Sequence, residues 1–176
     1  MLKIIFEAHS TSIDNEAKLS SGWNDIDLSE LGLKQSEELG ERYQDDLPDA
    51  VFCSDLQRSY KTAAIAFKDA YVPIFVDSSL RECDYGDFTQ LPKHEVEAQK
   101  EERISEPFPN GESYEDTSER MKAFLDDLKE NFDDQTVMIV GHRATQYGLE
   151  EHILGKPLEE VVSAPWAWQP GWMYEL

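Results

Sequence analysis

The sequence predicts an α/β fold with a mainly parallel central sheet. Two observations lead to this prediction: short apolar runs typical of buried strands recur along the chain, and segments with helical periodicity lie between them. Ligands of such folds bind at the carboxyl ends of the strands, so polar residues directly after an apolar run are the first candidates for a site. The length of 176 residues fits one domain, expected over residues 1–176.

Four apolar runs are expected to form short buried strands. They cover Leu2–Phe6, Ala50–Cys53, Val72–Val76 and Thr136–Val140. The last residues, Trp172–Leu176, fit an edge strand. Two helices are expected from their pattern: Leu31–Tyr43, and Arg143–Leu154, which Gly155 should stop.

Two further helices are predicted from the capping box. In this motif a serine side chain accepts the backbone amide three residues later, and the side chain of that later residue accepts the amide of the serine. Ser54 with Gln57 predicts a helix that runs to about Lys68. Ser113 with Asp116 predicts a second, in which apolar residues recur at helical spacing and form one face against the sheet.

The charge of the chain excludes several classes of partner. It carries 16 Lys and Arg against 37 Asp and Glu, a formal net charge of -21. Binding to nucleic-acid phosphates or to an anionic membrane surface is therefore not expected. The apolar content of 40% is too high for a disordered acidic tail, so we expect a true core beneath an acidic surface.

The cysteines and the first residues indicate the compartment. Cys53 and Cys83 are only two and lie far apart, which favours a reducing cytoplasm over a secreted protein built on disulfides. The apolar run at the start is cut by Glu7 and is too short for a signal peptide.

Two of the four histidines directly follow strand-like runs. His9 follows the first run and His142 the fourth, so both are expected at the carboxyl edge of the sheet. His94 lies in a charged segment and His152 inside a predicted helix, and both are interpreted as solvated or packed side chains.

An arginine and several carboxylates are expected at the same edge. Arg58 would lie in the first turns of the helix after the second strand, and Leu80–Asp87 brings three carboxylates behind the third strand. Histidines, an arginine and a carboxylate suit phosphoryl chemistry, which needs cations and donors around the phosphoryl oxygens, a nucleophile and a proton donor.

Seven short motifs, in order, resemble the histidine phosphatase superfamily, the phosphoglycerate-mutase-like proteins. They are Ala8-His9-Ser10 with Asn15; Gly22-Trp23-Asn24-Asp25; Leu28-Ser29-Glu30-Leu31-Gly32; Ser54, Leu56, Arg58, Thr62 and Ala63; Leu80, Glu82 and Gly86; Gly111-Glu112-Ser113; and His142. The resemblance spans nearly the whole chain and implies a three-layer α/β/α fold.

The resemblance also implies a mechanism. His9 would attack phosphorus and become a phosphohistidine, and Glu82 would protonate the leaving oxygen. Arg58, His142 and Asn15 would hold the equatorial oxygens, with help from backbone amides at the start of the helix after His142. Neither a metal nor another cofactor is required.

The chain departs from the family pattern beside the nucleophile. The arginine before it is Ala8 and the glycine after it is Ser10, which we still expect at the substrate. Loss of a preorganised donor costs about 3 kcal/mol. Either Arg143 replaces the missing cation, or the protein is a weak or dead enzyme. Arg143 would sit in the first turn of its helix, and its alternative role is an ion pair with an acid such as Glu7. Arg81 is a weaker candidate for the replacement.

Two other segments have two interpretations each. The charged segment Lys93–Glu106 is either a solvated helix face or a contributor to substrate choice. The cluster of Trp166, Trp168 and Trp172 closes a core or a homodimer interface, or else one tryptophan faces the ligand.

Three functions remain open. The first is a phosphatase that hydrolyses a small phosphomonoester, a phosphorylated metabolite. The second is phosphoglycerate mutase-type phosphoryl transfer. The third is a catalytically weak phospho-ligand sensor. The departure at Ala8 favours it, and the retention of four site residues opposes it: His9, Arg58, Glu82 and His142.

Overall fold

The central sheet has five strands in the order β3-β2-β4-β1-β5, and only β5 runs antiparallel to its neighbour. The computed structural model describes all 176 residues. The strands are Lys3–Ala8 (β1), Ala50–Cys53 (β2), Ile74–Val76 (β3), Thr136–Gly141 (β4) and Trp172–Glu175 (β5). The predicted mainly parallel sheet and the predicted edge strand near the end of the chain are confirmed, and the structure adds that this strand is antiparallel.

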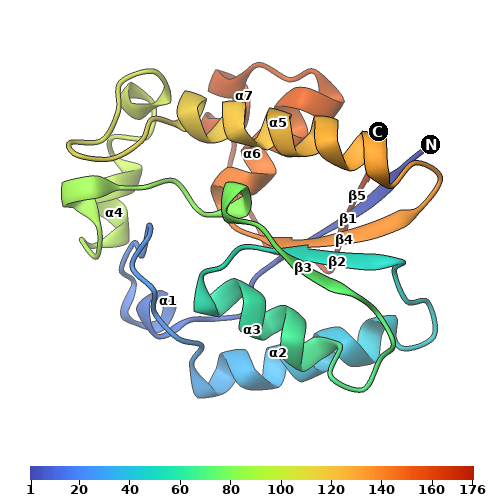
Figure 1. Cartoon of the computed structure of the whole chain (residues 1–176). Helices are drawn as coiled ribbons and strands as arrows, with labels where there is room; N and C mark the ends of the chain where they lie inside the picture. Colours follow the sequence, from blue (N-terminus) through green and yellow to red (C-terminus); the bar gives the residue numbers. More distant parts are fainter.

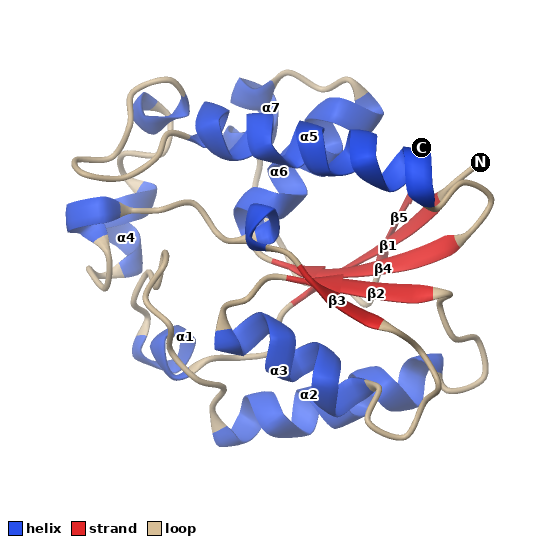
Figure 2. Cartoon of the chain, viewed as in Figure 1, coloured by secondary structure: helices blue, strands red, loops and turns tan.

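Helices cover both faces of the sheet, which confirms the three-layer arrangement. Figure 1 and Figure 2 show α2 and α3 on one face and α5, α6 and α7 on the other. None of them has the length and apolar character needed to cross a membrane. The helices are Ile13–Ala17 (α1), Glu30–Tyr43 (α2), Gln57–Ala66 (α3), Lys93–Glu97 (α4), Tyr114–Asn131 (α5), Arg143–Leu154 (α6) and Leu158–Ser163 (α7), with 3-10 turns at Ser78–Leu80, Gly86–Phe88 and Glu102–Ile104.

Local signals explain where two of the helices begin or end. The Ser113 side chain accepts the Asp116 amide while Asp116 accepts the Ser113 amide, so the predicted capping box of α5 is present. Helix α6 covers the predicted residues and ends at Gly155, whose φ of 66° is the left-handed conformation that glycine adopts most readily.

The predicted start at Ser54 is wrong. Helix α3 begins at Gln57, ends at Ala66, and has no side-chain cap. The Ser54 hydroxyl instead lies 2.7 Å from His142 Nε2, so a tertiary contact takes the group that the pattern assigns to the helix.

The predicted buried strand at Val72–Val76 is also partly wrong. Strand β3 covers only Ile74–Val76 and lies at the edge of the sheet. Phe75 and Val76 are exposed. Strand β3 pairs with β2 alone, so its other edge is open to solvent.

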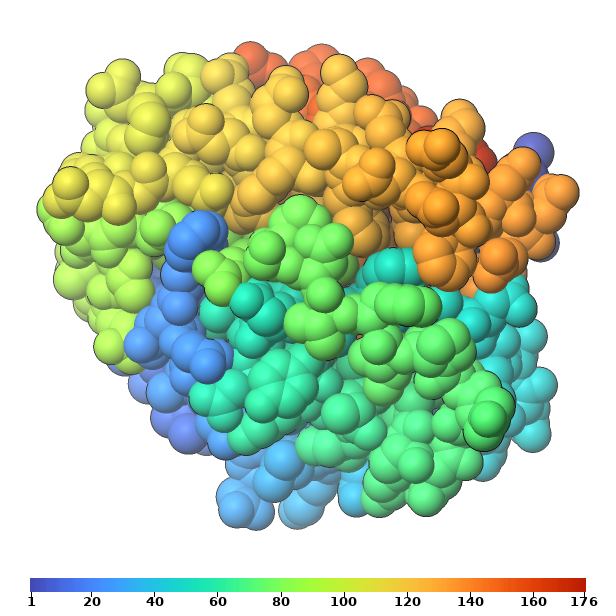
Figure 3. Space-filling view, viewed as in Figure 1, coloured from blue at the N-terminus to red at the C-terminus, as the bar shows by residue number.

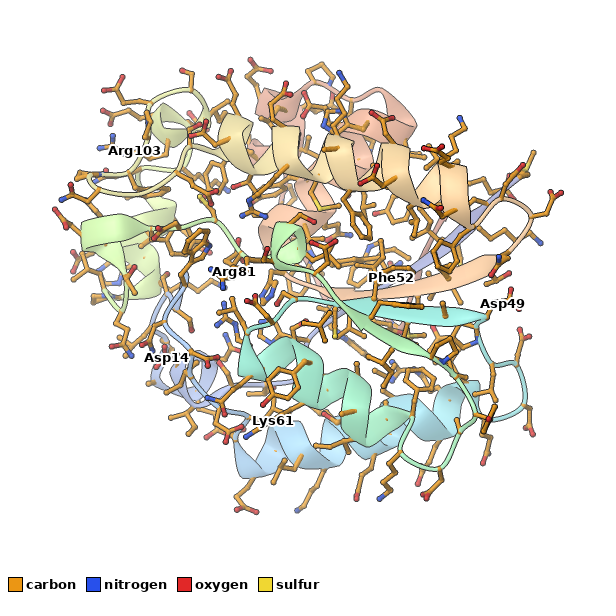
Figure 4. The ribbon with its side chains drawn as sticks, viewed as in Figure 1. Asp14, Asp49, Phe52, Lys61, Arg81 and Arg103 are labelled. Atoms are coloured by element: carbon orange, nitrogen blue, oxygen red, sulfur yellow. The ribbon has the colours of Figure 1, made fainter.

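Side chains of β1 alternate between the two cores. Ile4 and Phe6 pack with helix α5 in the core that also contains Phe52 of β2, whose side chain Figure 4 shows between the sheet and that helix layer. Ile5 packs with the core beneath α3. By this alternation Ala8 faces the same side as Phe6, toward α5 and α6. Strand β1 runs toward the end of the molecule where α1 and α4 lie (Figure 1).

Candidate active site

A cavity of about 1240 Å³ opens where the parallel strands end. His9 directly follows β1 and His142 directly follows β4, as predicted from the apolar runs. The cavity brings together all seven residues singled out from the sequence: His9, Ser10, Asn15, Arg58, Glu82, His142 and Arg143. Its position matches the carboxyl-edge rule for parallel sheets.

His9 is held with one ring nitrogen engaged and the other free. Its Nδ1 lies 2.7 Å from the carbonyl oxygen of Ser10. Because a carbonyl only accepts, Nδ1 carries the proton and Nε2 keeps its lone pair. Enclosure in the cavity, with a smaller contribution from Arg58, lowers the pKa of His9 to about 3. The imidazole is therefore neutral near pH 7 and can act as a nucleophile.

His142 faces His9, with ring centres 5.0 Å apart and an angle of 54° between the rings. It is almost fully buried, and its Nε2 lies 2.7 Å from the Ser54 hydroxyl. Its Nδ1 is buried without any hydrogen-bond partner. When Ser54 donates to Nε2, Nδ1 carries the proton, and a phosphoryl oxygen in the cavity would satisfy it. Burial, followed by the Arg58 charge, holds the pKa of His142 well below its usual range.

Arg58 is 2% exposed and enters the cavity from the second residue of α3. Its guanidinium donates to the carbonyls of Gly22, at 2.7 Å, and Asn24, at 3.0 Å. The same loop is held from outside, because Asp25 accepts the Gln57 amide at 2.7 Å. Figure 3 shows this loop in blue against the start of α3 in teal. Arg58 is thus fixed before any ligand arrives.

Glu82 lies on the amino end of α6. Its Oε1 accepts the backbone amides of Cys83 and Ala144, at 2.8 and 3.2 Å, and its Oε2 accepts the Arg143 amide at 3.2 Å. Burial raises the pKa of Glu82, and the backbone hydrogen bonds and Arg58 oppose that shift in part. Glu82 thus accepts the helix amides that are expected from the sequence to help bind phosphate.

Sequence reasoning missed Arg120 of α5, which fixes the backbone that carries Glu82. Its guanidinium donates to the carbonyls of Arg81 and Glu82, at 2.8 and 2.9 Å, and pairs with Glu112 at 3.0 Å. The indole of Trp23 donates to the same Glu82 carbonyl at 2.8 Å. The only sequence signal is its position: Arg120 borders the apolar face of its helix, where the stem of an arginine packs against the core.

Asn15 and Ser10 have different places in the site. Asn15 Oδ1 accepts the Ser12 amide at 2.9 Å, which leaves its NH₂ group for a ligand. The Ser10 hydroxyl accepts from Ser36 at 2.9 Å, and its amide donates to Thr62 at 3.0 Å. Ser10 is therefore tied into the wall, where its carbonyl orients His9.

Arg143 enters the cavity without a charged partner. None of the ion pairs in the structure contains it. Glu7, the expected alternative partner, pairs instead with Arg42 at 3.1 Å. Arg81 lies outside the cavity lining and bonds Asp55 at 2.7 Å; Figure 4 labels it beside the central loops. Of the two candidate replacements for the missing arginine, only Arg143 reaches the cavity.

The cavity lining reverses the charge balance of the chain. It includes six of the 16 basic residues and four of the 37 acidic ones, namely Lys18, Arg42, Arg58, Lys93, Lys100 and Arg143 against Glu7, Glu38, Glu82 and Glu97. No group of three or more His, Cys, Asp or Glu side chains is arranged to hold a metal ion. Positive charge is therefore concentrated where an anion would enter.

The two segments with open interpretations both contribute to this lining. Lys93, His94 and Lys100 come from the charged segment and line the rim while remaining accessible to water. Trp166 and Trp168 line the other side, whereas Trp172 packs against Phe6, with ring centres 5.7 Å apart. The tryptophans thus divide between the cavity and the core.

Comparisons with known proteins agree with this geometry. The family model for the histidine phosphatase superfamily (branch 1) matches residues 4–168. The uncharacterized phosphatase PhoE of Bacillus subtilis is 28% identical over 155 residues, 88% of this chain and 79% of that protein. Phosphoserine phosphatase 1 of Hydrogenobacter thermophilus is 28% identical over 168 residues, 91% of this chain and 80% of that protein.

A mutase and a solved structure complete the comparison. A 2,3-bisphosphoglycerate-dependent phosphoglycerate mutase of a Methylobacterium species is 31% identical over 131 residues, 67% of this chain and 63% of the mutase. The structure of Bacillus stearothermophilus YhfR has a TM-score of 0.85 at 22% identity and covers 100% of this chain and 92% of that one. At that identity the likeness establishes the fold.

Proposed function

The chain belongs to the histidine phosphatase superfamily, and we propose that it hydrolyses a small phosphomonoester through a phosphohistidine on His9. The observation that carries the proposal is the pair of facing imidazoles: His9 offers a free Nε2, and His142 offers a buried, unpartnered Nδ1. A nucleophile and an oxyanion donor thus face the same space.

The reaction proceeds in two balanced steps. His9 Nε2 attacks phosphorus, the bond from phosphorus to the leaving oxygen breaks, and Glu82 gives its proton to that oxygen. Glu82 then takes a proton from water, whose oxygen attacks the phosphohistidine and releases inorganic phosphate. His9 is restored as the neutral base, and Glu82 regains its proton.

Four side chains hold the phosphoryl oxygens. Arg58 and Arg143 supply positive charge, and His142 Nδ1 and Asn15 Nδ2 supply neutral donors. Ser10 acts mainly through its carbonyl, which keeps His9 in the reactive tautomer. The role of Arg143 decides between an active enzyme and a weak one, because Ala8 contributes no cation.

Catalysis is favoured over a sensor. Relatives named as phosphatases and as a probable phosphoglycerate mutase align with similar shares of this chain, 88–91%, so the experiment below separates hydrolysis from phosphoryl transfer. A sensor without catalysis has no need of an acid, yet Glu82 is retained on the helix amides. The substrate is a small phosphorylated molecule. We also propose a reducing cytoplasm as its compartment, which the two cysteines, far apart and both free, support.

One experiment separates the three functions. The protein is incubated with sugar phosphates, phosphoglycerates and phosphorylated amino acids, and free phosphate and acid-labile phosphohistidine are measured. Phosphate release that is lost in His9→Ala, but kept in the control His152→Ala at Ser118, supports a phosphatase. Isomer exchange without release would identify a mutase, and saturable binding with neither product would identify a sensor.

A further inference from the structure

Arg143 is held by three neighbours that sequence reasoning did not connect to it. Its Nη1 donates to Gln146 Oε1 at 2.9 Å. Its guanidinium carbon lies 4.6 Å from the ring centre of Tyr147 and 5.8 Å from that of Trp166. Stacking on aromatic faces restricts the orientation of a guanidinium without neutralising its charge. The side chain is therefore ordered and remains cationic.

Gln146 is the link between Arg143 and Trp166. It is 1% exposed, and its Oε1 accepts from Arg143 Nη1 and from Trp166 Nε1, both at 2.9 Å. Arginine and tryptophan are donors only, so the amide oxygen must face them. The amide nitrogen then faces the Tyr174 hydroxyl at 3.3 Å. Every contact of this buried amide agrees with one orientation.

Trp166 is anchored to the strand that carries the nucleophile. It stacks on Trp172, with ring centres 5.9 Å apart and 22° between the planes, and Trp172 packs on Phe6. Phe6 precedes Ala8 by two residues and faces the same side of β1. A continuous set of rings thus connects β1 with the guanidinium of Arg143, on the face where the family arginine is missing.

The placement of Arg143 is unfavourable without an anion. It occupies the first turn of α6, where a cation opposes the helix dipole. In a chain of net charge -21, this guanidinium still has no carboxylate partner. A phosphoryl group in the cavity would supply the missing negative charge.

We propose that Trp166 and Gln146 are positioning residues that hold Arg143 at the phosphoryl group, in place of the arginine absent at Ala8. The proposal rests on the proposed function, because it assigns a phosphoryl group to this cavity. It also gives the exposed Trp166 a role that core packing does not explain, since this side chain is 42% exposed and lines the cavity.

The test is a double-mutant cycle on phosphate affinity. Binding of inorganic phosphate and the values of kcat and KM are measured for Arg143→Ala, Trp166→Ala and the double variant. Arg143→Ala should weaken phosphate binding by about tenfold or more. Trp166→Ala should weaken it severalfold alone, and should add nothing in the Arg143→Ala background because its effect passes through Arg143.

Two further variants exclude simple loss of structure. Trp166→Phe keeps a stacking ring but loses the Nε1 donor, and should retain part of the affinity. Gln146→Glu keeps both accepted hydrogen bonds but neutralises the guanidinium, and should weaken phosphate binding while the protein stays folded by circular dichroism. Phe75→Ala, which removes a similarly exposed aromatic side chain (43%) from β3, outside the cavity lining, is the matched control for phosphate affinity.

The outcomes are distinct. Additive effects of Trp166→Ala and Arg143→Ala, or unchanged phosphate affinity in Trp166→Ala, would overturn the proposal. Loss of affinity in Phe75→Ala equal to that in Trp166→Ala would also overturn it. Failure of the phosphatase function itself is recognised separately, by the absence of trapped phosphohistidine in the parent protein.

Discussion

The carboxylate of Glu82 accepts the backbone amide of Arg143 at 3.2 Å, so the proposed acid and the proposed substitute cation share one helix end. His142 is the residue directly before that helix, lines the same cavity, and has a buried Nδ1 without a partner. Three groups with different tasks are thus fixed by the first turn of α6. A shift of this turn would disturb the acid, the donor and the cation together.

The position of Glu82 predicts how activity depends on pH. Its protonated form is needed to donate, and burial raises its pKa, so activity should be present below that raised pKa and fall as pH rises through it. His9 must be neutral, and with a pKa of about 3 it limits activity only in strong acid. The pH profile of kcat/KM measures both the alkaline limb, the loss of activity set by Glu82, and the acid limb, the loss set by His9.

Glu82→Gln provides the control for that assignment. The variant should lose the alkaline limb and about 10²–10⁴-fold in rate on an alkyl phosphate, whose leaving alcohol needs a proton. An aryl phosphate with a nitrophenolate leaving group should lose much less. An equal loss on both substrates would contradict the role of Glu82 as the acid.

Ser54→Ala should reduce turnover by about tenfold while the protein stays folded. The Ser54 hydroxyl is the contact of His142 Nε2, and without it the proton of the neutral ring is free to move to Nε2, which leaves no donor at Nδ1. Nitrogen NMR of the imidazole reports this change of tautomer directly. Ser163→Ala, which removes an exposed hydroxyl, is the control and should have no effect on either measurement.

Sequence patterns predicted the elements better than the partners of their side chains. Ser113 and Ser54 carry similar capping patterns, but only Ser113 caps a helix. The difference is His142, which lies 88 residues from Ser54 and uses its hydroxyl. A local pattern contains no information on such a competitor, so tertiary contact decides between equal local signals.

The site residues that directly follow a strand could be predicted from the sequence. His9 and His142 could be placed together because each follows an apolar run, and the structure places their rings 5.0 Å apart. The contact of Gln146 with Trp166, which completes the setting of Arg143, was not predictable, because Trp166 reaches the cavity from a loop outside the periodic segments. The same limit applies to Arg120, whose carbonyl partners belong to an irregular loop.

Arg120→Met should destabilise the protein and slow turnover together. The substitution removes charge-assisted hydrogen bonds to the Arg81 and Glu82 carbonyls and leaves Glu112 without its cation. We expect a loss of about 2–3 kcal/mol in the free energy of unfolding, measured with urea. Lys122→Met, an exposed change on the same helix, should cost less than about 0.5 kcal/mol. A normal kcat in Arg120→Met would show that the Glu82 backbone needs no such support.

The acidic surface should slow the entry of highly charged substrates. The net charge of -21 repels anions at long range, while the basic residues of the lining attract them only near the cavity. We expect kcat/KM to rise with ionic strength up to physiological salt, more steeply for a bisphosphate than for a monophosphate. A bisphosphate turned over much faster than its monophosphate counterpart at low salt would contradict this expectation.

Restoring the arginine at position 8 tests whether Arg143 truly replaces it. Ala8 faces the same side of β1 as Phe6 and lines the cavity, so an arginine placed there would point toward the region that Arg143 serves. Ala8→Arg alone would put two guanidinium groups at one phosphate, and we expect little gain over the parent. In the Arg143→Ala background the same change should recover a large part of the lost kcat/KM, because a cation again lies at the phosphoryl oxygens. If Arg143→Ala reduces activity and Ala8→Arg fails to restore any of it in a folded double variant, the two positions do not serve the same oxygens.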